Sequence, residues 1–126
     1  MEIREAEVQS KKEHDYRVNV WGSFQYKIWN RTGGNGIMVL LVTAYDPSGK
    51  LILSFDQVYG PKVPGRCPRN GDRGRAKFQI KLPQEKGPYR IVAYGAAAYD
   101  KEDALNKLRK GGLGYPIETI GTVDVH

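Results

Sequence analysis

The chain has one cysteine, two histidines and no long apolar run. Cys67 cannot form an internal disulfide, and no second thiol or histidine stands near it to suggest a metal site. His14 and His126 are not close in sequence to a plausible nucleophile or a pair of carboxylates, so acid–base and nucleophilic catalysis lack candidates. No stretch approaches the roughly 18 apolar residues of a membrane span. The sequence therefore predicts a protein that is not an enzyme, needs no cofactor and does not insert into a membrane.

Residues 1–17 are charged and lack the apolar centre of a signal peptide. We therefore expect a soluble protein that is made inside a cell and stays in the cytoplasm. The length of 126 residues predicts a single domain spanning 1–126, large enough to bury a core without a disulfide or metal. Asparagine and glutamine number five each while charged residues are plentiful, which favours a heat-adapted source.

The positive charge is concentrated in one segment, residues 60–77. The chain carries a net charge of +6, and this segment holds six bases and one acid. Its four glycines and three prolines exclude a regular helix or central strand and predict a loop. We expect the end of the segment to join the next strand, with Arg75 and Lys77 facing water beside Lys81 and with Ala76 facing inward. The bases of the segment are Lys62, Arg66, Arg69, Arg73, Arg75 and Lys77.

Strands are predicted wherever apolar residues alternate with polar ones, because successive side chains of a strand point to opposite faces. Gly22 is expected to mark a bulge or bend that divides the long alternating run around it into two strands. The run 37–45 is apolar on both faces, which is typical of a central strand. The turn Asp46–Gly49 then leads into its hairpin partner. The expected strands are 3–8, 16–28, 37–45, 51–55, 76–82, 89–99 and 117–125.

One helix is predicted, over residues 101–110. Asp100 can cap its first turn, with Asp103 completing an imperfect capping box, and Gly111 with Gly112 can end it. Leu105 and Leu108 are its apolar anchors. We expect this short helix to lie as a lid over one end of a sheet.

About seven short strands and one late helix predict a mainly β fold, an antiparallel β-sandwich, with a partly open barrel as the alternative. Three stretches, Val42–Ile52, Gly74–Pro83 and Gly87–Ala93, carry a D-P-x-G-K hairpin, a G-x-A-x-F strand and a G-x-Y-x-I strand. In this order they resemble the middle of immunoglobulin-like sandwiches of the macroglobulin and bacterial adhesin kind. The resemblance implies an immunoglobulin-like fold and no particular activity.

The small, highly charged chain is also similar to accessory or virion proteins of viruses that infect hyperthermophilic archaea. That similarity implies a protein located in the host cytoplasm or in the virion.

The six bases of the segment 60–77 admit three interpretations. They can bind the phosphates of a nucleic acid without reading its sequence, for which arginine's planar fork is well suited. They can bind an acidic protein or another anionic surface. They can also be a solvated loop that keeps a β-protein soluble.

The aromatic residues admit two interpretations. They can form an exposed contact patch, because such rings are enriched where proteins bind one another, and Trp21, Trp29 and Tyr59 are then the main interface candidates. Alternatively, the same rings are core or lid residues beneath the helix. The six aromatic residues concerned are Trp21, Trp29, Tyr59, Tyr94, Tyr99 and Tyr115.

The sequence favours a non-enzymatic structural or accessory protein that binds a partner protein or further copies of itself. Nucleic-acid binding through the basic segment is the alternative. A weaker alternative is an enzyme or small-ligand binder whose site is assembled from distant residues.

Overall fold

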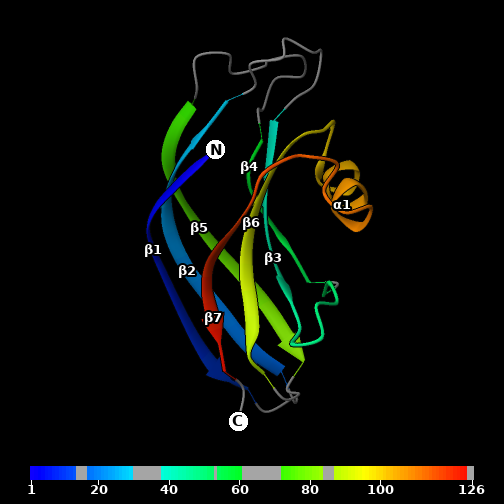
Figure 1. Cartoon of the computed structure of the whole chain (residues 1–126). Coiled ribbons are helices and arrows are strands. Elements are labelled where there is room, and N and C mark those ends of the chain that lie inside the picture. The colour runs from blue at the N-terminus through cyan, green and yellow to red at the C-terminus, as the bar shows by residue number, and fades with distance from the viewer. Residues whose placement is uncertain (14–16, 30–37, 53, 61–71, 84–86, 125–126) are drawn as a thin grey trace.

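The computed structural model describes residues 1–13, 17–29, 38–52, 54–60, 72–83 and 87–124. These residues form two antiparallel sheets and one short helix, which confirms the predicted mainly β fold (Figure 1). A three-stranded sheet has the order β1-β2-β5, and a four-stranded sheet has the order β4-β3-β6-β7. The elements are β1 (Glu2–Lys12), β2 (Arg17–Ile28), β3 (Met38–Tyr45), β4 (Asp56–Tyr59), β5 (Asp72–Pro83), β6 (Tyr89–Ala97), α1 (Lys101–Arg109) and β7 (Ile117–Val123).

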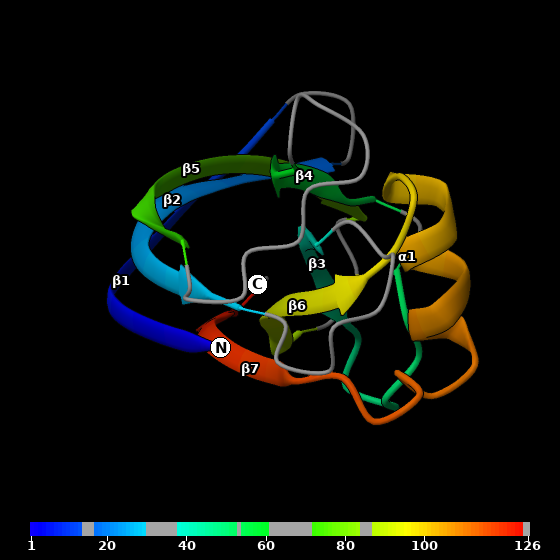
Figure 2. The same cartoon turned by 90° about the horizontal axis from the view of Figure 1, so that it is seen from above.

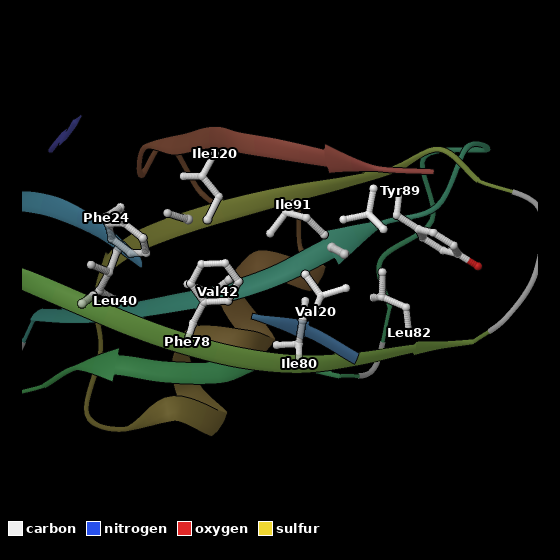
Figure 3. Close-up of a cluster of buried hydrophobic side chains, with 14 of the residues drawn as sticks. Val20, Phe24, Leu40, Val42, Phe78, Ile80, Leu82, Tyr89, Ile91 and Ile120 are labelled. Carbon is white, nitrogen blue, oxygen red and sulfur yellow. The ribbon is translucent and has the colours of Figure 1, made fainter. Parts of the chain in front are cut away.

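The two sheets face each other, and their inner sides form the main hydrophobic core (Figure 2). Figure 3 shows Phe24 of β2 and Phe78 of β5 in the same buried cluster as Leu40 and Val42 of β3. The ring centroids of the two phenylalanines lie 6.1 Å apart. Burying each such side chain contributes about 1.5–3 kcal/mol, so this layer supplies much of the stability of the fold. The arrangement is that of a β-sandwich.

Helix α1 covers the outer side of the four-stranded sheet, as the predicted lid does (Figure 2). Leu105 packs with Val39 and Leu41 of β3, while Leu108 packs with Tyr94 of β6. Strand β3 is therefore buried on both faces, between β4 and β6, which confirms its predicted central position. No helix in the described part of the chain is long and apolar enough to cross a membrane.

The predicted caps of α1 are confirmed. The Asp100 carboxylate accepts a hydrogen bond from the backbone N–H of Asp103 at 2.8 Å, and the Asp103 carboxylate accepts one from the N–H of Tyr99 at 3.0 Å. The Tyr99 hydrogen bond, with the nearby Lys107 ammonium, lowers the pKa of Asp103 below its usual value. Beyond the helix, Gly111 and Gly112 take positive φ angles of 94° and 87°. Glycine adopts this backbone conformation without strain, so the helix ends where the sequence predicts.

The prediction that residues 51–55 form the strand paired with β3 in a hairpin is wrong. Of residues 51, 52, 54 and 55, which the structure describes, Leu51 alone forms a bridge to β3, and the paired strand is β4, which begins at Asp56. Leu51 and Phe55 instead pack on the cluster beneath α1, and the Ser54 backbone carbonyl accepts a hydrogen bond from the Thr43 hydroxyl at 2.8 Å. Packing of these side chains overrides the alternation that predicted a strand here.

The end of the segment 60–77 joins the next strand, as predicted, but the strand begins earlier in the segment than expected. Strand β5 begins at Asp72 and continues through Gly74. A Cβ atom on Gly74 would lie 2.6 Å from the Tyr26 hydroxyl oxygen, so the glycine makes room for that ring. The predicted directions of Arg75, Ala76 and Lys77 are confirmed, because the two bases are exposed and Ala76 is buried. Residues 61–71 lie outside the described residues.

Neighbouring strands or side chains cover the lateral edges of the two sheets. At one side, the backbone N–H groups of Gln79 and Lys81 in β5 donate to the Asp56 carboxylate and the Ser54 hydroxyl, both at 3.0 Å. At the other side β1 lies beside β7, where a Cβ on Gly121 would lie 2.7 Å from the Val8 side chain (Figure 2). An uncovered strand edge invites pairing with another chain, and these contacts reduce that exposure.

Gly22 lies inside a continuous β2, so the expected break of this run into two strands is wrong. The irregularity falls in β1 instead, where the register with β2 shifts between Arg4 and Glu7. A side chain at Gly22 would collide with the Glu7 carbonyl oxygen and approach the Phe78 ring to 3.0 Å. The glycine therefore permits both the bulge in β1 and the core position of Phe78.

We expect Gly22→Ala to lower the free energy of unfolding by roughly 1–3 kcal/mol, the usual cost of overpacking a core site. Urea unfolding followed by circular dichroism measures the change. Gln25→Ala, on the exposed face of the same strand, should change stability by no more than about 0.5 kcal/mol. Equal losses of stability in the two variants would contradict this account, because they would show that the space around Gly22 accepts a side chain.

Candidate functional site

The described end of the basic segment forms one face of β5. Arg73, Arg75, Lys77, Gln79 and Lys81 are exposed, whereas the residues between them turn toward the core or lie at its margin. Side chains two residues apart on one face of a strand are separated by roughly 7 Å. The bases of this segment therefore stand in a regular row on the outer side of the three-stranded sheet.

The register of the sheet adds bases from two other strands. Lys27 of β2 lies opposite Arg73, and Gln25 lies opposite Arg75. On the other side of β2, Arg4 of β1 lies opposite Gln25. Bases from the first, second and fifth strands thus gather at one end of the sheet.

These side chains surround a hollow of about 550 Å³. Four bases and one acid line it, so it is strongly positive. The acid, Glu2, lies 3.6 Å from the guanidinium of Arg4, and both side chains are at least half exposed. Such an exposed pair is weak and is screened by salt. The lining residues are Glu2, Arg4, Gln25, Tyr26, Lys27, Arg73, Gly74 and Arg75.

A second hollow, of about 400 Å³, involves the next part of β5. Trp21 of β2, half-buried and opposite Gln79, contributes to its wall together with Lys77. The amide of Gln79 donates to the Asn19 side-chain oxygen at 2.9 Å, which fixes the position of Gln79. The lining residues are Trp21, Gly22, Asp56, Lys77, Phe78 and Gln79.

We use the term basic face for the outward positions of the three-stranded sheet. The strand pairings and the alternation of side chains place eight bases and two acids there, and Glu13, directly after the end of β1, adds a third acid. Among the described residues, Lys81 pairs with Glu13 at 3.5 Å, and Arg75 donates to the Ser23 hydroxyl at 3.1 Å. The charged residues of the basic face are Arg4, Lys11, Arg17, Lys27, Arg73, Arg75, Lys77 and Lys81, with Glu2 and Glu7.

The structure places half of the predicted anion-binding residues on this face. Arg73, Arg75 and Lys77 belong to it, whereas Lys62, Arg66 and Arg69 lie outside the described residues. Sequence reasoning missed Arg4, Lys27 and the neutral Gln25. The alternation around β2 indicates that Lys27 faces outward, but no local signal specifies which strands flank β2.

The three predicted interface aromatics do not form one patch. Trp21 lies within the basic face, and Trp29 follows the end of β2, where the Lys27 ammonium lies 5.6 Å from its ring centre. Tyr59 belongs to the other sheet and packs edge-on against Tyr26 at 5.4 Å, next to the core. Tyr94 is fully buried beneath α1.

Metal binding and unusual acid–base chemistry find little support in the described residues. They contain no group of three or more histidine, cysteine, aspartate or glutamate side chains placed to hold a metal ion. Burial raises the pKa of Tyr94 to about 12, and its hydroxyl donates to the Gly112 carbonyl at 2.8 Å. This tyrosine supports the helix and does not border either hollow.

No protein-family model matches this chain, and neither a curated protein nor a solved structure matches it. The fold and the surface chemistry therefore carry the functional argument by themselves.

Ionic quenchers of tryptophan fluorescence should detect the positive charge of the basic face. In Trp29→Phe, Trp21 is the remaining tryptophan, and iodide should quench it at least about twofold more effectively than caesium because a positive surface concentrates anions. The difference should shrink at high salt, where the charges are screened. Arg75→Glu with Lys77→Glu should remove most of it. Equal quenching by both ions would contradict a positive potential at Trp21.

Proposed function

We propose that the protein binds nucleic acid through the basic face without reading its sequence. The observation that carries the proposal is the convergence of Arg4, Lys27, Arg73 and Arg75 around one hollow. Phosphate binding replaces the counterions condensed on a nucleic acid, which makes clustered bases effective. Three of the four bases are arginines, whose guanidinium fork matches phosphate oxygens.

The electrostatic balance of the face supports an anionic ligand. Within the described part of the chain, no acidic side chain forms a salt bridge with Lys27, Arg73, Arg75 or Lys77. Their charges are therefore available to a ligand at little desolvation cost, since the three residues of β5 are exposed. Folding alone does not require this concentration of like charge on one side of a sheet, because adjacent bases repel one another.

The shape of the basic face favours contact with the phosphate backbone of a nucleic-acid duplex over contact with its nucleobases. The only helix in the described part of the chain lies over the opposite sheet, so no helix projects from the basic face to enter a major groove. Long, exposed lysine and arginine side chains reach phosphates, and phosphate contacts carry no sequence information.

We also propose that the sandwich is immunoglobulin-like. In that fold the first, second and fifth strands share one sheet, and the sixth lies between the third and the last. The pairings β1-β2-β5 and β3-β6-β7 agree with this order, whereas β4 lies beside β3 here and the fourth strand of the seven-stranded form lies beside the fifth. A tyrosine at the start of the sixth strand, whose hydroxyl bonds to the backbone upstream, is a further feature of the fold. Tyr89 begins β6, and its hydroxyl donates to the Pro83 carbonyl at 3.2 Å. This assignment supports no activity by itself.

A second candidate function is contact with a partner protein or another copy of the chain, which the sequence favours. The supporting observation is the exposure of apolar side chains beyond α1, where Leu113 is 57% exposed and Ile117, at the start of β7, is 37% exposed. Two side chains form a much smaller apolar surface than a stable interface needs. We therefore place this candidate after nucleic-acid binding.

Reversing the charge of β5 should abolish nucleic-acid binding. We expect the unmodified protein to bind fluorescein-labelled DNA and RNA 20-mers at about 50 mM salt, and four phosphate contacts should weaken the affinity on the order of 100-fold by 200 mM. The triple variant Arg73→Glu, Arg75→Glu, Lys77→Glu should show no binding, because repulsion replaces attraction. Fluorescence anisotropy measures both effects, and circular dichroism checks that the variant is folded.

The matched control is Lys50→Glu, Lys101→Glu, Lys110→Glu, which changes the net charge equally at exposed positions away from the basic face. It should retain most of the binding. An equal loss in both triple variants would show that net charge alone is responsible. Absence of binding to every DNA and RNA tested at 50 mM salt would refute the proposal.

The second candidate predicts self-association at a chain concentration on the order of 100 μM, a level that detects even weak dimers. Light scattering should then give a mass above the 14.2 kDa of one chain. Leu113→Asn combined with Ile117→Lys should restore the monomer mass, because both changes remove exposed apolar surface. Asparagine tolerates the positive φ of 51° at position 113. A monomer at every concentration would exclude self-association.

A further inference from the structure

The basic face contains one aromatic side chain among its strand positions, and that side chain lies near the middle of the face. Trp21 lies opposite Gln79 of β5 and Gln9 of β1, with rows of bases toward both ends of the sheet. A half-buried tryptophan on the outer side of a sheet is unusual when its neighbours are polar and exposed, because its apolar surface gains little from that position. The core does not explain this residue, since Trp21 faces away from it.

The hollow beside Trp21 combines a flat apolar wall with polar groups. Lys77 supplies a positive charge, and Gln79 and Asp56 supply hydrogen-bonding atoms. Two of these groups are held in place: the Gln79 amide donates to Asn19, and the Asp56 carboxylate accepts from the backbone N–H of Gln79. An aromatic surface beside fixed polar groups and a cation is the chemistry that receives a nucleobase next to its phosphate.

We propose that the basic face prefers single-stranded nucleic acid, with an unpaired base stacked on Trp21 and the flanking phosphates on Lys77 and Arg75. This inference rests on the proposed nucleic-acid binding and specifies the form of the ligand. A base inside a duplex is stacked on its neighbours and cannot reach a tryptophan on a sheet surface, whereas a single strand exposes every base. Stacking is tolerant of sequence because every base has a flat face.

The experiment compares three fluorescein-labelled probes with the unmodified protein: a 12-nucleotide single strand, a hairpin duplex containing that strand, and the same single strand with abasic sites. We expect the single strand to bind more tightly than the duplex. We also expect the abasic strand to bind about 5- to 100-fold more weakly than the intact strand, which is the effect of losing base–aromatic stacking. This comparison does not depend on any protein variant being folded.

Substitutions test the role of the tryptophan itself. Trp21→Ala should weaken binding of the single strand by about 5- to 100-fold and leave duplex binding within about twofold, while Trp21→Phe should retain most of the single-strand affinity. Tyr99→Ala, which removes an exposed aromatic on the other side of the molecule, is the matched control and should change neither. In Trp29→Phe, binding of the single strand should quench the fluorescence of Trp21.

The outcomes separate the inference from the function on which it rests. Equal affinity for single strand, duplex and abasic strand, with no effect of Trp21→Ala, would overturn the base-stacking inference and leave charge-driven binding intact. Loss of affinity for all three probes in Trp21→Ala but not in Trp21→Phe, without a difference between intact and abasic strands, would show a structural role and would also overturn it. No binding of any probe by the unmodified protein would refute both proposals.

Discussion

The pairing of β2 with β5 is the constraint on which both the core and the basic face depend. It runs without interruption from Arg17 opposite Pro83 to Ile28 opposite Asp72. Because successive side chains of a strand alternate between faces, this one register sends Phe24 and Phe78 inward and Lys27 outward. A slip by one residue would expose the phenylalanines and bury the bases, so burial of the core also holds the charged surface together.

The surroundings of this strand pair leave the basic face as an exposed side of the sandwich. Helix α1 covers the outer side of the opposite sheet, and Ser54 and Asp56 occupy backbone donors at the free edge of β5. At the other side, β1 lies beside β7. The outer side of the three-stranded sheet keeps its charged side chains in water, and it carries both hollows. The proposed binding site is therefore a consequence of how the rest of the molecule is covered.

Much of the fold could be predicted, because it depends on local patterns. The alternation around β2 and β5, the apolar run of β3 and the caps of α1 are all confirmed. The errors fall where packing opposes local preference. Residues 51–55 alternate as a strand should, but the cluster beneath α1 takes Leu51 and Phe55. Gly74 predicts a loop and yet lies in β5, because the Tyr26 ring occupies the space of a side chain. The immunoglobulin-like assignment and the partner stay predictions.

The sequence by itself determined which side of β2 and of β5 faces the core, where the helix begins and ends, and that Arg75 and Lys77 share an exposed strand face. These properties follow from the period of a strand and from capping, which act over a few residues. Only the tertiary structure decided that Arg4 and Lys27 join Arg73 and Arg75, and that Trp21 lies beside Lys77. Strand order and register bring together residues far apart in the chain, and burial of a common core selects them. The basic segment is a local feature of the sequence, whereas the basic face is a property of the folded sheet.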